Sequence, residues 1–150
     1  MTIPELAARS NLSEKYVKSR IGTVPGVEAI DGSYIIPEGT RFPFDISRYK
    51  KFTFGNCRYI IVKATDEKRY IDADMLRLSQ GEFAALIKEL VETNYIRAIQ
   101  TENTLGANGY ISTAKYDEIK QQRREQIIRI ITEAVNAVST AVPVVCAAVT

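Results

Sequence analysis

The chain of 150 residues lacks histidine and tryptophan altogether and contains only two cysteines. Without histidine it has no copy of the side chain that most often serves as a general base or a metal ligand. Cys57 and Cys146 lie too far apart in the sequence for a metal-binding spacing, and there is no Gly-rich phosphate-binding loop. We therefore expect no catalytic residues, no metal site, no cofactor, and a protein that is not an enzyme.

A strong excess of charge is also missing, since 20 basic side chains face 18 acidic ones and the formal net charge is +2. A protein that coats nucleic acid without sequence preference needs a much larger excess of basic over acidic residues. Any DNA binding by this chain must therefore come from a local basic patch or from association of several chains. The first residues show no basic run followed by an apolar run, which argues against a secretory signal. A cytoplasmic location with reduced thiols is the simplest interpretation.

Apolar residues make up 45% of the chain, enough for a sizeable core, and its first fifty residues carry a clear local pattern. Residues 2–21 predict two short helices around a tight turn, with Ser13 capping the second helix. Asn11 occupies the turn, where its side chain tolerates the left-handed conformation. Asp31 and Gly32 lie between two β-prone runs, which predicts a tight hairpin after the helices.

The helix pair has a recognisable set of side chains. Ala7 provides the small residue needed where two helices cross, and Asn11 replaces the usual glycine of the turn. Leu12 follows the turn and Val17 lies in the second helix, at positions that need apolar side chains. On these residues the segment from Ile3 to Lys18 resembles the helix-turn-helix of the excisionases and related small winged-helix regulators. With the hairpin as the wing, the resemblance implies a bacterial or phage-type regulator that binds double-stranded DNA.

In such a module the second helix presents its first residues to base edges while the first helix braces it across the backbone. Lys15 and Lys18 suit phosphate or guanine edges, and Glu14 suits cytosine. The wing departs from the pattern because Glu28 and Asp31 repel phosphate. The candidate DNA-binding residues are Ser13, Glu14, Lys15, Tyr16, Lys18, Ser19, Arg20, Arg41, Arg48, Lys50 and Lys51. An open alternative is that they are solvated charges on a module used for protein contact.

The second half of the chain predicts the same order of elements. Helices are expected from Cys57 to Ala64 and from Ala73 to Leu78, and a capping box at Ser79 opens a strongly amphipathic third helix. Strands are expected at Tyr95–Gln100 and Tyr110–Ser112, joined by a loop rich in asparagine and glycine. The exposed face of the third helix is acidic, which favours assembly or partner binding over DNA binding for this half.

The last segment predicts one long helix with a seam of β-branched residues at strict 3,4 spacing. The seam consists of Ile128, Ile131, Val135, Val138, Val142, Val145 and Val149. We expect it to bind other copies of the chain in assemblies above a dimer, because β-branched residues at both core positions disfavour parallel dimers. Two alternatives remain open: a core helix within one chain, and a membrane tail formed by the uncharged stretch from Ala134 to Thr150.

Together these patterns predict a mainly α protein with small β-hairpins, of the α+β class. Two tandem winged-helix-like units are expected at 1–47 and 48–114, followed by an apolar oligomerisation helix at 115–150. The expected function is that of a sequence-specific DNA-binding regulator acting as a homo-oligomer. The alternatives are a structural or interaction protein built from the same modules, and a tail-anchored membrane protein with a winged-helix head.

Overall fold

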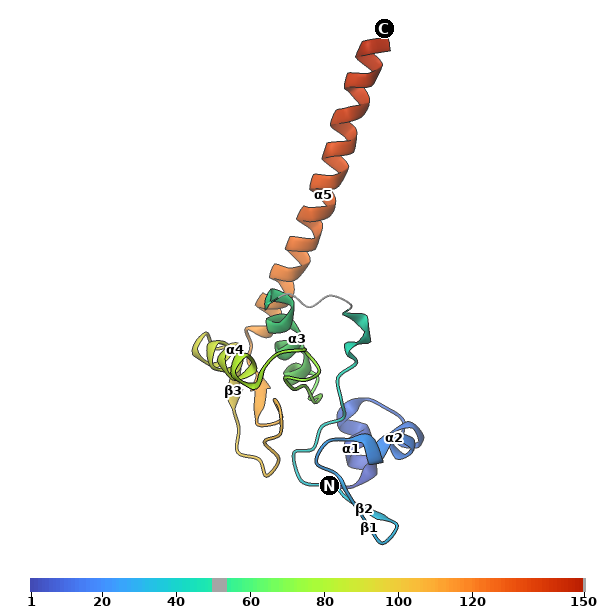
Figure 1. The fold of residues 1–150 in the computed structure, drawn as a ribbon, viewed down its shortest axis with the longest axis vertical. Helices are drawn as coiled ribbons and strands as arrows, with labels where there is room; N and C mark the ends of the chain where they lie inside the picture. The colour runs from blue at the N-terminus through green and yellow to red at the C-terminus, as the bar shows by residue number, and fades with distance from the viewer. Residues whose placement is uncertain (50–53, 150) are drawn as a thin grey trace. The chain divides into compact units, whose positions relative to one another are not determined.

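The computed structural model describes the backbone of residues 1–49 and 54–149, and the side chains of residues 1–47, 49 and 56–137. The chain divides into two compact units, residues 1–116 and 117–150 (Figure 1). The first unit holds helices α1 to α4 and two antiparallel hairpins, and the second lies in the long helix α5. The α+β class expected from the sequence is confirmed. The domain boundary that the sequence predicts at residue 47 lies inside the first of these two units.

Helices α1 (Ile3–Ser10) and α2 (Glu14–Arg20) form the expected pair. Thr2 caps α1 in a capping box, and the Ser13 side chain caps α2 by accepting a hydrogen bond from a backbone N–H of its first turn. Asn11 between them has φ 54° and ψ 45°, the left-handed conformation predicted for the turn. Local side-chain chemistry therefore determines where both helices begin and where α1 ends.

A hairpin of strands β1 (Glu28–Ile30) and β2 (Ser33–Ile35) follows, after the 3-10 turn Ile21–Thr23. Asp31 and Gly32 have φ values of 49° and 76°, so both central residues of the turn have the positive φ that a type I′ turn needs. Helices α1 and α2 share one apolar core with the residues that follow them. Its buried members are Leu6, Ala7, Val17, Ile21, Val24, Ile36 and Phe42.

The second half contains helices α3 (Phe54–Asp66) and α4 (Gln80–Glu92) and the hairpin of β3 (Ile96–Ala98) with β4 (Tyr110–Ser112). Ser79 caps α4 in the predicted capping box. The amphipathic face of α4 is buried as expected, through Phe83, Leu86, Ile87 and Leu90.

The helix predicted from Ala73 to Leu78 is wrong, because this segment is a series of turns. The Asp72 carboxylate accepts a hydrogen bond of 2.8 Å from the Met75 backbone N–H and starts the first turn. Arg77 then has φ 57°, a left-handed conformation that ends any helical continuation. Short-range side-chain bonding thus replaces the helix that hydrophobic spacing alone suggested.

The segment from Thr40 to Phe44 joins the helix pair to the second half. Its backbone pairs with Tyr70 in a short parallel bridge, in which Tyr70 donates to the Phe42 carbonyl at 2.9 Å and Phe44 donates to the Tyr70 carbonyl at 2.8 Å. The Arg69 guanidinium adds bonds to the carbonyls of Phe42 and Pro43. These bonds explain why the first 116 residues form one unit.

Helix α5 (Tyr116–Val149) provides the long C-terminal element that the sequence predicts. Within its described side chains the seam residues Ile128, Ile131 and Val135 are 56%, 57% and 56% exposed. The side chains of Val138, Val142, Val145 and Val149 lie outside the described residues. Over the part of the chain that the structure describes, no helix is long and apolar enough to cross a membrane.

Candidate functional site

The outward face of α2 carries most of the candidate DNA-binding residues. Lys15, Lys18 and Ser19 are exposed and fall at i, i+3 and i+4, so they share one side of the helix. Val17 is fully buried and anchors the other side against α1. Burial of Val17 therefore fixes which face of α2 stays in water.

The hydroxyl groups of Ser13, which caps α2, and Ser19 each make one hydrogen bond within the protein. The Ser13 Oγ accepts from the Tyr16 backbone N–H at 3.2 Å, as a cap does. The Ser19 Oγ donates to the Tyr16 carbonyl at 2.6 Å. Each hydroxyl keeps a lone pair for an outside donor, and Ser13 also keeps its proton.

The side chains of Tyr16 and Arg20 are held against the protein. The Arg20 guanidinium lies 5.5 Å from the centre of the Tyr16 ring, and this ring lies 5.7 Å from the Phe42 ring. Tyr16 is nevertheless 43% exposed. These contacts therefore link α2 to the segment that joins both halves, while the Tyr16 side chain stays partly exposed.

Arg41 does not lie on this surface. It is 2% exposed, and its two terminal nitrogens donate to the carbonyls of Ala107 at 3.2 Å and Tyr110 at 2.5 Å. Burial, and to a smaller extent the charge of Arg9, lowers the pKa of the guanidinium to about 10. Arg41 is thus a structural cation that phosphate does not reach. The apolar residues that follow it in the sequence were the available signal for burial.

The remaining candidates divide between described and undescribed positions. Glu14 is exposed in the first turn of α2, beside Lys15. The Arg48 side chain and the residues Lys50 and Lys51 lie outside the described residues. In the described chain no three potential ligands among aspartate, glutamate and cysteine come together to hold a metal ion.

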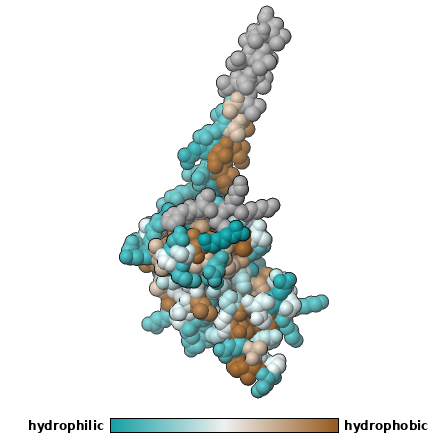
Figure 2. Space-filling model, viewed as in Figure 1, coloured by the Kyte–Doolittle hydropathy of each residue, from teal (hydrophilic) through white to brown (hydrophobic). Residues whose placement is uncertain are grey.

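The hairpin that corresponds to the wing is apolar and acidic. Ile30, Tyr34 and Ile35 are 46%, 44% and 51% exposed, and brown apolar atoms appear at this end of the molecule in Figure 2. Glu28 and Asp31 are exposed on the same hairpin. These two strands carry no basic side chain, whereas α2 carries Lys15, Lys18 and Arg20.

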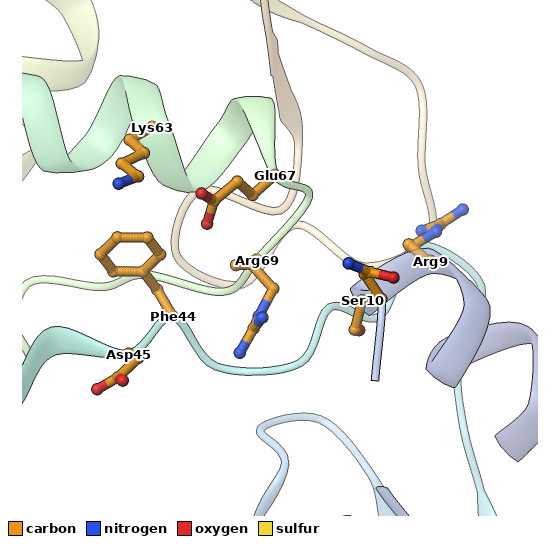
Figure 3. Close-up of a pocket in the computed structure, with 8 residues that line it drawn as sticks. Arg9, Ser10, Phe44, Asp45, Lys63, Glu67 and Arg69 are labelled. Carbon is orange, nitrogen blue, oxygen red and sulfur yellow. The ribbon is translucent and has the colours of Figure 1, made fainter. Parts of the chain in front are cut away.

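A cavity of about 350 Å³, which the sequence did not predict, opens beside the α1–α2 turn (Figure 3). Its walls come from three separate segments of the chain. They are lined by Arg9, Ser10, Asn11, Phe44, Asp45, Lys63, Glu67 and Arg69. The Ser10 Oγ is buried there without a hydrogen-bond partner.

A second, more apolar hollow of about 550 Å³ runs along α4 and reaches β3 and the loop before β4. Phe83, Ile87 and Val91 form much of its wall, with Lys88 and Glu92 at its edge.

Comparison of the chain with protein-family models, with curated proteins and with solved structures found no match. Function is therefore inferred from the chemistry of these surfaces alone.

Proposed function

We propose that this chain is a sequence-specific DNA-binding regulator of bacterial or mobile-element type that acts in the cytoplasm as a homo-oligomer. The observation that carries the proposal is the exposed face of α2. Lys15, Lys18 and Ser19 project from a helix that α1 braces through the buried Val17. A winged helix-turn-helix presents its second helix to the major groove in this way.

The chemistry of this face suits both parts of DNA recognition. Lysine pairs with phosphate or with guanine O6 and N7, and serine hydroxyls bond to phosphates or to base edges. Glu14 in the first turn is a ready acceptor for a cytosine amino group. The capped, packed helix holds these groups before DNA arrives, so little conformational entropy is lost on binding.

One chain alone offers few phosphate contacts. Lys15, Lys18 and Arg20 give α2 three cations, and Glu14 offsets one of them. Affinity for DNA grows with the number of phosphates contacted, so several copies acting together bind far more tightly than one. The low net charge of the chain therefore fits an oligomer better than a monomer.

Helix α5 supplies the surface for self-association. Ile128, Ile131 and Val135 lie along one seam, and Ile127 and Ile130 beside it are 47% and 59% exposed. Burial of a valine or isoleucine contributes roughly 1.5–3 kcal/mol, so covering the three seam residues is worth on the order of 5 kcal/mol per chain. Isoleucine and valine at both core positions favour three or more strands.

The proposal is tested with purified full-length protein by light scattering and by titration of double-stranded DNA fragments over a range of salt concentrations. The expected results are a mass above that of a dimer and a binding constant whose logarithm falls linearly with the logarithm of the salt concentration. A monomer at all micromolar concentrations would contradict the oligomer. Absence of DNA binding at low salt would contradict the regulator.

A second candidate function has its own support. The exposed Ile30, Tyr34 and Ile35 of the hairpin and the apolar hollow along α4 are surfaces typical of protein contact. An assembly protein built on the same fold would use these surfaces together with the α5 seam. The titration above separates the two functions, because an assembly protein forms the oligomer and leaves DNA unbound at every salt concentration.

A further inference from the structure

The seam of α5 changes from polar to apolar within the described side chains. Ile128, Ile131 and Val135 are each more than half exposed. Towards the N-terminus the same 3,4 spacing continues through Arg124 and Gln121, which are exposed as well. The face that would meet another helix is therefore polar in the first turns of α5 and apolar from Ile128 onward.

Arg124 has no acidic neighbour at the spacings where side chains of one helix meet. Lys120 lies four residues before it and Ile128 four residues after it, while Gln121 and Ile127 lie three residues away. Like charges at i, i+4 repel each other. Lys120 and Arg124 therefore form a basic pair beside the seam whose repulsion their own helix does not relieve.

The acid that complements this basic pair is Glu125. Its Oε1 accepts a hydrogen bond of 3.2 Å from the side-chain amide of Gln121, which belongs to the seam. The carboxylate is thus held on the seam side of the helix. In heptad terms Lys120 occupies position g and Glu125 the following position e, and side chains at g and e form the ion pairs that set the direction of helices in a coiled coil.

We propose that the α5 helices of several copies pack parallel and in register, with Glu125 of each copy paired with Lys120 and Arg124 of its neighbour. The inference rests on the self-association proposed above and adds its direction. Arg124 joins the pairing because a side chain at position d packs beside position e of the next helix. The Arg124 side chains of all copies share one layer, and the neighbouring carboxylates offset their repulsion. Below that layer apolar side chains meet apolar side chains from Ile128 onward.

An antiparallel packing loses both matches. When Ile128 lies against Ile131 of a neighbouring copy, the polar end of one seam lies beside the apolar part of the other. Arg124 is then opposite Val135, and a charged group buried against an apolar side chain costs free energy. Glu125 meets no cation of the neighbour in this alignment. The order of charges along α5 therefore selects the parallel direction.

The direction has a consequence for DNA binding. Helix α5 begins at Tyr116, the residue that ends the first unit of the chain. A parallel bundle consequently carries the first units of all copies at one end, where several α2 helices can contact the same DNA duplex. Antiparallel helices would hold the first units at opposite ends of the bundle. Contacts made together on one duplex raise the affinity far above that of a single copy.

Disulfide cross-linking of the full-length chain tests the direction. The background is Cys146→Ser, and Cys57 is left in place because it is buried. Gln121→Cys places a thiol in the seam, whereas Gln126→Cys places one on the exposed face outside it. In a parallel bundle two copies of residue 121 face each other, so glutathione disulfide should link the Gln121→Cys chains and leave the Gln126→Cys chains single. In the antiparallel alignment these positions lie about 25 Å apart along the axis, too far for a disulfide.

The charge pairing is tested by Glu125→Lys, with Glu133→Lys as the matched control. Both glutamates are exposed and lie four residues from Arg129, so both substitutions change the ion pairing within one helix alike. Glu125→Lys places a third cation against the basic pair of the neighbouring copy. Its midpoint concentration for assembly, measured by sedimentation, should rise by about tenfold or more, and that of Glu133→Lys should equal the wild-type value.

The outcomes separate this inference from the self-association on which it rests. An oligomer that Gln121→Cys does not link, or one that Glu125→Lys and Glu133→Lys form equally well, would overturn the parallel packing and leave self-association standing. A wild-type chain that is monomeric at all micromolar concentrations would overturn self-association, and the parallel packing with it.

Discussion

The Arg41 guanidinium donates a hydrogen bond of 2.5 Å to the Tyr110 carbonyl across 69 residues of sequence. The same guanidinium donates to Ala107, so one buried cation satisfies two carbonyls of the loop and strand that close the second half. No carboxylate forms an ion pair with it in the described part of the chain. Arg41 therefore joins the helix pair to the β3–β4 hairpin through directional bonds rather than through charge neutralisation.

Arg41→Met is expected to lower the free energy of unfolding by roughly 2 kcal/mol, because it removes the donor from the buried Ala107 carbonyl and from the partly buried Tyr110 carbonyl. Chemical denaturation followed by far-UV circular dichroism measures the change. Arg97→Met is the matched control, since Arg97 is exposed on β3 and should shift stability by less than about 0.5 kcal/mol. Equal effects of the two substitutions would remove the structural role assigned to Arg41.

Gly32 and Gly106 both have a positive φ, but the space around them differs. A Cβ at Gly106 would lie 2.3 Å from the Ile71 carbonyl oxygen, whereas a Cβ at Gly32 would meet no atom within 4 Å. Gly32→Ala therefore carries only the backbone strain, about 1 kcal/mol, and Gly106→Ala should cost several times more because backbone must also move. Thermal melts of the two variants give the comparison, and a Gly32→Ala that is the more destabilised would contradict the packing described around Gly106.

Features set by a few neighbouring residues were predictable from the sequence. Asn11 in the turn, the Asp31-Gly32 hairpin and the capping box at Ser79 each depend on local hydrogen bonds and φ preferences. The apolar residues that follow Arg41 signal its burial, but its bonding partners were not predictable, because they are carbonyls that lie more than sixty residues away. The cavity beside the α1–α2 turn was missed for the same reason, since three distant segments form it.

The α5 seam is tested by one charge placed in it. Val135→Asp would put a carboxylate into the core of each assembled bundle, so the oligomer should dissociate or weaken at least tenfold in concentration. Gln126→Asp adds the same charge to an exposed position off the seam and should leave the assembly intact. Sedimentation velocity measures both, and a Val135→Asp oligomer as stable as that of Gln126→Asp would show that the seam is not the interface.

DNA binding by α2 is tested most directly by the salt dependence of binding in Lys15→Ala/Lys18→Ala. The control, Lys88→Ala/Lys120→Ala, removes the same number of charges from exposed positions on α4 and α5. If both lysines of α2 contact phosphate, the slope of log affinity against log salt should become shallower by about two units per chain, and the control slope should equal that of the wild type. Identical slopes for the α2 variant and the wild type would contradict the account.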